Sequence, residues 1–182
     1  PHDPIAMNVD AGIWNWMDVF GSHIMEKMTA AGLKGVSQQY RFDDYWPGTT
    51  ETCIWKGVVG MLTEAARVNY ASPVYIEPNE LYTVGKGLGE YAKSINFPEP
   101  WPGGWWRLGH IVEYERVSML SILETASKYR AGLLRFRNQH TRQEVEKGRT
   151  QAPYYYILPQ GQHDPSERVH IANLLHEQGI SI

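Results

Sequence analysis

The sequence predicts an α/β protein, and three observations lead to that class. A short apolar run at 57–66 has the length and composition of a buried β-strand. Two longer segments, 13–31 and 110–147, carry apolar residues at every third or fourth position, which is the spacing of amphipathic helices. The end of the chain, 154–182, alternates strand-like, helix-like and strand-like segments, as a β-α-β unit does.

Size and composition restrict the class of protein further. The chain has 182 residues, of which 42% are hydrophobic and 20% charged, as in one globular domain or one domain and part of another. Its formal net charge is −3, so we expect no nucleic-acid partner. No apolar run approaches the roughly 18 residues of a transmembrane helix, so we expect no membrane span. The single cysteine, Cys53, excludes an internal disulfide framework.

The first predicted helix, 13–31, has one apolar stripe and a stop signal at Gly32. The stripe consists of Ile13, Trp16, Met17, Phe20, Ile24, Met28 and Ala31. The helix also contains His23-Ile24-Met25-Glu26, an H-x-x-E spelling that occurs in metal sites. At about 100° per residue, His23 flanks the stripe and Glu26 points almost away from it, so we interpret this match as accidental. The remaining histidines form no cluster with ligand spacing.

The predicted strand at 57–66 ends on a carboxylate, Glu64. α/β sheets commonly place their chemistry at the carboxyl ends of strands. An ionised Glu among apolar residues is costly to bury, so it pairs, shifts its pKa upward or takes part in a reaction. The structural alternative is that Glu64 caps a helix start or pairs with Arg67.

A polar and aromatic loop, 40–51, precedes this strand and contains the turn pair Pro47-Gly48. Such a loop forms either a pocket wall or lid, or a solvated connection. After the strand, 67–78 is expected as a loop or second strand. The Gly, Pro and Trp-rich segment 86–106 is expected to be irregular but packed. A carbohydrate- or peptide-binding groove at its tryptophans is a further possibility.

The longest periodic segment, 110–147, predicts a helix that ends at Gly148 with a basic last part. A strand is then expected at 154–158. Asp164 is an N-cap, Pro165 fits the first helical position and Glu167 completes a capping box. This helix is expected to run to about Gln178, and a second strand to begin at 180.

The order of several segments resembles the zinc carboxypeptidase family, that is, the carboxypeptidase A-like metallopeptidases, and most closely its large bacterial multidomain branch. The segments are Phe42-Asp43-Asp44-Tyr45-Trp46-Pro47-Gly48, Gly57-Val58-Val59-Gly60-Met61-Leu62-Thr63-Glu64, Ala71-Ser72-Pro73, Pro100-Trp101-Pro102-Gly103-Gly104-Trp105-Trp106 and Tyr154-Tyr155-Tyr156-Ile157-Leu158-Pro159. The resemblance implies the C-terminal part of a mixed-sheet catalytic domain at 1–80 and a Trp-rich segment with a long linking helix at 81–150. It further implies the truncated start of a glutamine-amidotransferase-like α/β domain at 151–182.

The same resemblance implies hydrolysis of peptide bonds, with Glu64 as general base and acid and Zn²⁺ as the cofactor. The family holds its zinc with two His and one Glu, which precede the part of the domain seen here. A loop tyrosine closes over the substrate, and Tyr45 is the first candidate for it, with Tyr40 the second. The implied partners are a peptide or protein substrate and the remainder of a parent chain, which by resemblance is secreted or periplasmic.

The chain departs from the family pattern in two respects. The paired Asn-Arg that holds a substrate carboxylate is not found, and His2 lacks the context of the third zinc ligand. The sequence starts at Pro1 and not at Met, and Pro1-His2-Asp3-Pro4 has no signal-peptide features, so we expect an internal piece of a longer protein. Because the resemblance places all three zinc ligands before this piece, we expect it to be inactive by itself and without catalytic zinc. The alternative functions are a non-catalytic peptide- or carbohydrate-binding module and a pseudo-peptidase without metal ligands.

Overall fold

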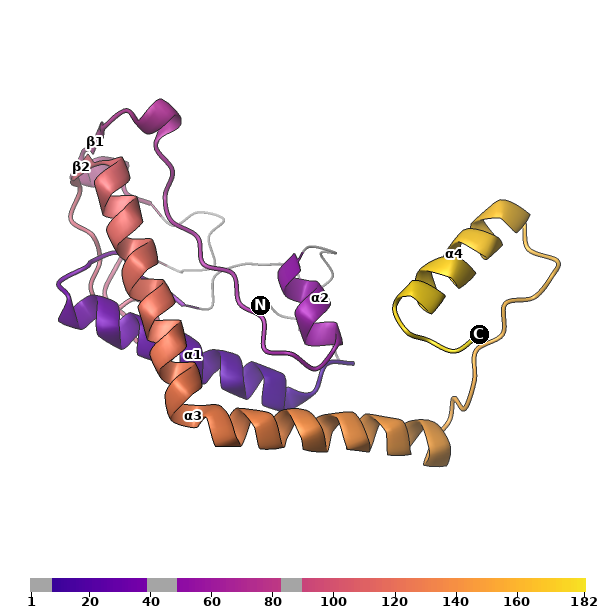
Figure 1. Cartoon of the computed structure of the whole chain (residues 1–182). Helices are drawn as coiled ribbons and strands as arrows, with labels where there is room; N and C mark the ends of the chain where they lie inside the picture. The colour runs from indigo at the N-terminus through magenta and orange to yellow at the C-terminus, as the bar shows by residue number, and fades with distance from the viewer. Residues whose placement is uncertain (1–7, 39–48, 83–89) are drawn as a thin grey trace. The chain divides into compact units, whose positions relative to one another are not determined.

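A computed structural model describes residues 8–38, 49–82 and 90–182 of the chain (Figure 1). Helices predominate and are accompanied by one small sheet, so the predicted combination of helix and sheet is confirmed in this coarse form. The chain divides into two compact units, Pro1–Thr141 and Arg142–Ile182. The elements are α1 (Ala11–Ala30), α2 (Thr49–Trp55), β1 (Val74–Ile76), β2 (Gly104–Trp106), α3 (Leu108–Thr150) and α4 (Pro165–Glu177). The predicted segments 1–80, 81–150 and 151–182 stay a prediction.

Helix α1 confirms the helix predicted at 13–31, although it begins two residues earlier. Asp10 is its N-cap and accepts a hydrogen bond from the Gly12 N–H at 2.7 Å. The buried face is the predicted stripe, with Ile13, Phe20, Ile24 and Met28 inside. The helix ends before Gly32, whose φ of +73° is one that glycine adopts without strain.

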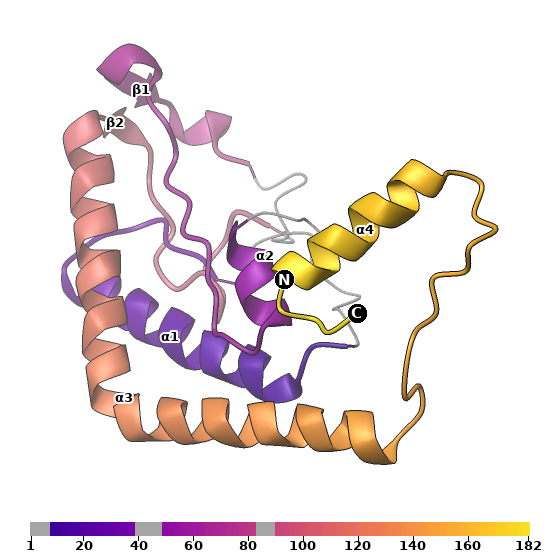
Figure 2. The same cartoon turned by 45° about the vertical axis from the view of Figure 1, so that its right-hand side comes forward.

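Helix α3 confirms the long helix predicted at 110–147, but it continues past Gly148 to Thr150. Both views show α1 alongside α3 (Figures 1 and 2). Ile24 and Met28 of α1 form a buried cluster with Val117 of α3. Burial of such side chains contributes about 1.5–3 kcal/mol each, and this apolar cluster holds the two helices together in the first unit.

The buried face of α3 also carries three small polar residues, Ser118, Ser121 and Thr125. Thr125 Oγ1 donates to the Ser121 carbonyl oxygen at 2.8 Å, which satisfies the Thr125 hydroxyl inside its own helix. Small side chains leave room beside a helix, so this face offers space that larger apolar residues would fill.

A second core cluster contains Val9, Ile13 and Ile54, the last of which lies in α2. Sequence reasoning missed α2, because part of it was assigned to the loop 40–51. A seven-residue helix is too short to show a helical period, and it is stabilised by tertiary packing of Ile54, which is only 3% exposed.

The predicted strand at 57–66 is wrong. Residues 58–68 form no strand with any residue that the structure describes. Val59 packs instead against the cluster of Val9, Ile13 and Ile54. An apolar run becomes a strand only when a neighbouring backbone pairs with it, and the described part of this unit offers no such neighbour.

The sheet is formed by β1 and β2, which pair antiparallel with Tyr75 opposite Trp105. Their rings meet edge to face at a centroid distance of 5.3 Å. β1 confirms the strand alternative at 67–78, and β2 ends the Trp-rich segment. Gly103 precedes β2 with φ +93°, and a Cβ there would lie 2.8 Å from the Ile76 carbonyl oxygen, so this close approach requires glycine.

In the second unit, α4 confirms the predicted helix. The Asp164 carboxylate accepts from the backbone N–H groups of Ser166 and Glu167 at 2.8 and 3.2 Å. The strands predicted at 154–158 and 180–182 are wrong, since neither segment pairs with a described residue. Two short strands and one helix cannot bury both faces of a sheet, so the ladder does not form. No described helix combines the length and hydropathy that a bilayer span requires.

Candidate pocket and polar clusters

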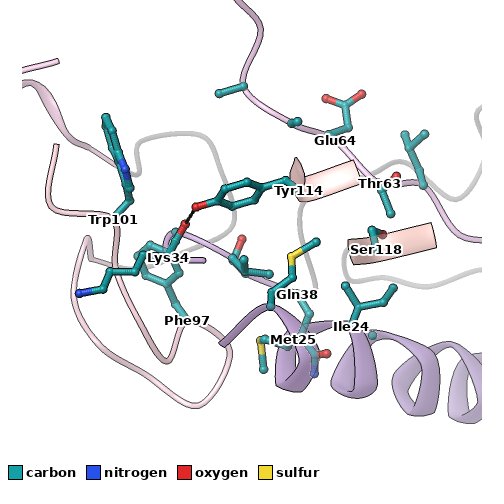
Figure 3. Close-up of a pocket in the computed structure, with 18 of the residues that line it drawn as sticks. Ile24, Met25, Lys34, Gln38, Thr63, Glu64, Phe97, Trp101, Tyr114 and Ser118 are labelled. Carbon is teal, nitrogen blue, oxygen red and sulfur yellow. Dashed lines mark hydrogen bonds between the residues drawn. The ribbon is translucent and has the colours of Figure 1, made fainter. Parts of the chain in front are cut away.

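The first unit contains a pocket of about 690 Å³ (Figure 3). The walls of the pocket come from α1, the segments 34–38 and 60–67, the small sheet, the Trp-rich segment and α3. Its aromatic and methionine lining consists of Met17, Met25, Met28, Met61, Tyr91, Phe97, Trp101, Trp106 and Tyr114, with Trp14 and Tyr82. A largely apolar cavity of this volume is typical of small-molecule or short-peptide sites. Methionine adapts its shape to different apolar groups.

One wall of the pocket comes from a single face of α1. Met17, Gly21, Ile24, Met25 and Met28 line it, and they recur at the three- and four-residue spacing of one helical face. The apolar stripe read from the sequence therefore serves both the core and the pocket.

Two loops are joined at the next wall by backbone hydrogen bonds. The Gly35 N–H donates to the Glu99 carbonyl oxygen at 2.6 Å, and the Gln38 N–H to the Asn96 carbonyl oxygen at 3.1 Å. Tyr114 Oη of α3 donates to the Lys34 carbonyl oxygen at 2.5 Å (Figure 3). These bonds satisfy backbone groups of irregular segments that have no sheet to pair with.

Partial burial changes the acidity of two tyrosines in this wall. Desolvation raises the pKa of Tyr114 above its ordinary value, and the hydrogen bond to Lys34 opposes this rise in part. Desolvation likewise raises the pKa of Tyr91, against the hydrogen bond that its hydroxyl donates to the Trp101 carbonyl oxygen at 2.8 Å. Both phenols are therefore neutral donors over the physiological pH range.

Glu64 lies on the pocket-lining segment 60–67. Two contacts flank it: Thr63 Oγ1 donates to Glu115 Oε2 at 3.2 Å, and Trp106 Nε1 donates to the Ala66 carbonyl oxygen at 2.6 Å. The Glu64 side chain is exposed, and its carboxylate points away from Tyr114 and Ser118 (Figure 3). The structure thus brings Glu64 to the pocket rim, but in an irregular segment and not at a strand end.

The two tyrosines predicted to close over a substrate, Tyr45 and Tyr40, lie outside the described residues. Sequence reasoning missed a different set of polar groups. Ser118 Oγ, Gln38 Oε1 and Trp14 Nε1 are buried, line the pocket and have no hydrogen-bond partner among the described residues. The available signal was Ser118 itself, a polar interruption of the apolar face of the segment 110–147.

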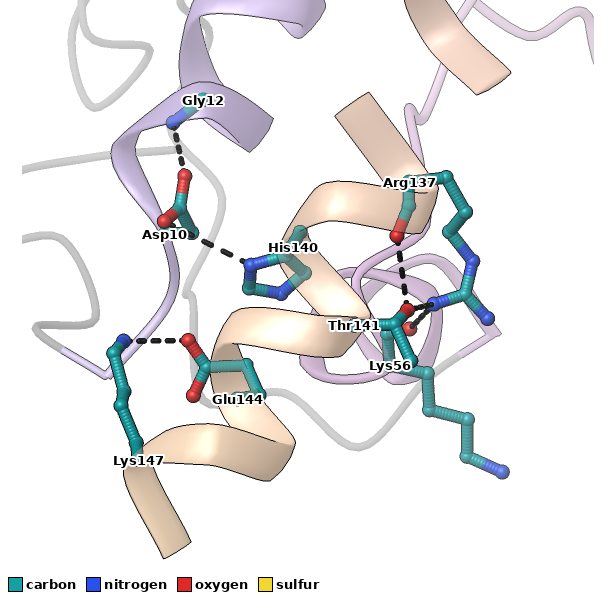
Figure 4. Close-up of polar contacts among 8 residues, drawn as sticks. All are labelled: Asp10, Gly12, Lys56, Arg137, His140, Thr141, Glu144 and Lys147. Atoms are coloured by element: carbon teal, nitrogen blue, oxygen red, sulfur yellow. Dashed lines mark hydrogen bonds and ion pairs between the residues drawn. The ribbon is translucent and has the colours of Figure 1, made fainter. Parts of the chain in front are cut away.

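A separate polar cluster joins the start of α1 to α3 (Figure 4). Asp10 Oδ2 lies 3.7 Å from His140 Nδ1, in addition to its N-cap bond. Arg137 Nη1 donates to the Lys56 carbonyl oxygen and to Thr141 Oγ1, both at 2.9 Å. These contacts link the ends of α1 and α2 to the same stretch of α3.

Charged side chains surround the H-x-x-E motif of α1, which consists of His23 and Glu26. His23 Nδ1 is 3.9 Å from Glu26 Oε2, and His23 Nε2 is 3.7 Å from Glu124 Oε1 of α3. Lys27 Nζ is 3.2 Å from the same Glu124 oxygen. Within either unit, the described residues contain no group of three His, Cys, Asp or Glu side chains close enough to share one ion, around Glu64 or elsewhere.

Comparisons with known proteins return no relative. No family model, curated protein or solved structure matches the chain. The resemblance to the zinc carboxypeptidases therefore stays a prediction, and function must be argued from the pocket and its rim.

Proposed function

We propose that this chain is part of a zinc-dependent metallopeptidase of the carboxypeptidase type, in which Glu64 is the general base and acid. The position of Glu64 on the pocket rim supports the proposal most directly. Its neighbours on either side, Thr63 and Ala66, are tethered to α3 and β2, so the backbone that carries the carboxylate is held in place.

The chemistry assigned to Glu64 is proton transfer. A carboxylate near a bound peptide can take a proton from water and pass it to the leaving amine, a contribution of typically 10²–10⁴-fold in rate. Glu64 is exposed and keeps access to water, which this role requires. The apolar pocket beside it offers a place for the side chain of the peptide.

The described residues do not provide a zinc site beside Glu64. In the proposed enzyme, two His and one Glu from another segment of a longer protein hold the metal. The isolated chain is accordingly proposed to be inactive, and no step through the metal is derived from its residues.

The test compares the 182-residue chain with a longer protein that includes the preceding part of the catalytic domain. Zinc is supplied to both, and cleavage of blocked peptides and bound zinc are measured. We expect turnover only in the longer protein, and a loss of about 10²-fold or more in Glu64→Gln with zinc still bound. Glu80→Gln is the matched control, since Glu80 lines the same pocket and should keep turnover.

Either of two results would refute the proposal. Hydrolysis by the 182-residue chain alone would contradict its being an incomplete part of the site. Full turnover in Glu64→Gln would remove Glu64 from the reaction.

A non-catalytic peptide-binding module is the second candidate. The observation that favours it is the direction of the Glu64 carboxylate, away from Tyr114 and Ser118 (Figure 3). In that case Glu64→Gln should leave peptide binding unchanged, while substitution of Trp106, which lines the pocket, should weaken it.

A further inference from the structure

We infer that the pocket binds an uncharged amide that carries a bulky apolar group, and that it disfavours a ligand with a free carboxylate. The inference deepens the proposed function, on which it rests for the biological ligand, a peptide. It assigns internal, amide-capped peptide groups to this pocket in preference to a chain terminus, and so assigns endopeptidase rather than exopeptidase action to the proposed enzyme.

Three polar atoms of the pocket lining have no hydrogen-bond partner among the described residues. Ser118 is 2% exposed, and its hydroxyl has no partner among the described residues. In the same lining, the acceptor Gln38 Oε1 and the donor Trp14 Nε1 also have no partner within residues 8–38, 49–82 and 90–182. A buried polar atom without a partner costs free energy, so a ligand toward which one of these covered side chains turns relieves that cost and gains affinity.

A planar amide carries both a donor and an acceptor, the two kinds of partner that these atoms lack. Its N–H can donate to Gln38 Oε1, and its carbonyl oxygen can accept from Trp14 Nε1 or the Ser118 hydroxyl. The amide oxygen of Gln38 packs against Gly21 of α1. A Cβ at position 21 would lie only 2.8 Å from this oxygen, so glycine allows the observed position of the Gln38 side chain.

The apolar surface of the pocket favours a bulky apolar group on the ligand. Five aromatic rings of the Trp-rich segment, the sheet and α3, together with the methionines of α1, surround the space. Burial of an aromatic or branched aliphatic group against them supplies the larger share of affinity, because the gain grows with the apolar area removed from water.

The charge of the pocket lining disfavours a ligand carboxylate. The charged residues of the lining are Asp18, Glu64, Glu80 and Glu115 against Lys34 and Arg67. Acidic groups outnumber basic ones, and Glu115 already accepts a hydrogen bond from Thr63. A ligand carboxylate would incur a large desolvation cost and be repelled by charges of like sign, whereas a neutral amide incurs a smaller desolvation cost and meets no such repulsion.

The experiment uses the 182-residue chain and two matched ligands, N-acetyl-L-phenylalaninamide and N-acetyl-L-phenylalanine, titrated by calorimetry. Tryptophan fluorescence provides a second readout, because Trp14, Trp101 and Trp106 line the pocket. We expect saturable binding of the amide and binding of the carboxylate at least about tenfold weaker, as an uncompensated charge implies.

Two serine variants test the contact itself. Ser118→Ala should weaken amide binding about three- to tenfold, as the loss of one hydrogen bond implies. Ser121→Ala is the control, since Ser121 is equally buried on the same helix, its hydroxyl also has no partner in the described part of the chain, and it does not line the pocket. Circular dichroism checks that both variants keep the helix content of the parent chain.

The outcomes distinguish a failure of this inference from a failure of the peptidase proposal. Absence of saturable binding up to millimolar amide, equal binding of amide and carboxylate, or equal effects of the two serine substitutions would each overturn the inference. Amide binding that is selective and sensitive to Ser118, together with no hydrolysis by the longer protein, would refute the peptidase proposal and leave the inference standing.

Discussion

Trp106 donates a hydrogen bond from its indole Nε1 to the carbonyl oxygen of Ala66 at 2.6 Å. This contact ties an irregular segment to the small sheet across forty positions of sequence. Trp106 also meets the rings of Trp101, His110 and Tyr114 at centroid distances of 5.2 to 5.9 Å. One side chain thus connects the segment that carries Glu64 with the aromatic wall and the start of α3.

Trp106→Phe keeps an aromatic ring but removes the donor to Ala66. We expect the free energy of unfolding to fall by about 1–3 kcal/mol, because the Ala66 carbonyl loses its partner and packing is lost. Urea denaturation, monitored by circular dichroism, measures this change in the free energy of unfolding. Trp105→Phe is the control, because Trp105 is 50% exposed, and it should change stability by less than about 1 kcal/mol. Equal losses in the two variants would contradict a special role for the Ala66 contact.

Tyr114 predicts a loss of stability at alkaline pH. Burial raises its pKa in the folded chain, so the unfolded chain releases the phenolic proton first as the pH rises. The stabilising contribution of Tyr114 is therefore complete below the ordinary tyrosine pKa of 10.0 and is lost as the pH rises through the higher folded value. Thermal unfolding between pH 8 and about 11 should show this decline.

Tyr114→Phe should flatten that decline and lower stability near neutral pH by about 0.5–1.5 kcal/mol, because the hydrogen bond to Lys34 is lost. Tyr70→Phe is the control, since the Tyr70 side chain is fully exposed. An unchanged alkaline profile in Tyr114→Phe would argue against burial as the cause.

Glu124 predicts the opposite dependence at acid pH. The hydrogen bond from Lys27 chiefly lowers the pKa of Glu124, with a further contribution from His23. A depressed folded pKa means that the contribution is present above the ordinary value of 4.5 and is lost as the pH falls through the folded value. Glu124→Gln should reduce the acid-side loss of stability, and Glu90→Gln should not.

Salt dependence provides an independent check on the Lys27–Glu124 ion pair. Glu124 is exposed, so screening should weaken its attraction to Lys27, and added salt should shrink the difference between parent and variant. A difference that salt does not change would point to packing of the Glu124 side chain as its origin.

Gly103→Ala should destabilise the β1–β2 pair. A Cβ would approach the Ile76 carbonyl oxygen to 2.8 Å, and φ is +93°, which alanine tolerates poorly. We expect a loss of about 1–3 kcal/mol in chemical denaturation. Gly109→Ala in α3 is the control, because open space surrounds Gly109, and helix propensity predicts no loss or a gain of up to about 1 kcal/mol. Tolerance of Gly103→Ala would show that the turn before β2 adopts another conformation.

Local patterns predicted the helices well, because the information for a helix lies within a few residues. Ile13, Phe20, Ile24 and Met28 repeat at helical spacing and are all buried in α1. Asp164 was recognised as an N-cap from its own chemistry and its neighbour Pro165, and it caps α4. Helix ends were less accurate, as the continuation of α3 beyond Gly148 shows.

The strand predictions at 57–66, 154–158 and 180–182 failed for the converse reason. The apolar runs at 57–66 and 154–158 have strand composition, but neither has a pairing partner among the described residues. A ladder requires a second backbone, and its presence is a property of the fold and not of the segment. Glu64 was predicted as a catalytic carboxylate at a strand end; it lines the pocket, but the strand that was expected to hold it is absent from the described structure, and its catalytic role stays a prediction.

The sequence by itself determined the positions of α1, α3 and α4, because side-chain periodicity and cap chemistry are local, whereas the catalytic role of Glu64 stays a prediction. Only the tertiary structure decided that Ser118, Gln38 and Trp14 line one pocket with unsatisfied polar atoms. It also decided that Trp106 and Glu115 hold the segment around Glu64. The physical reason is that burial and hydrogen bonding between distant residues depend on which surfaces meet, and no local spacing encodes that meeting.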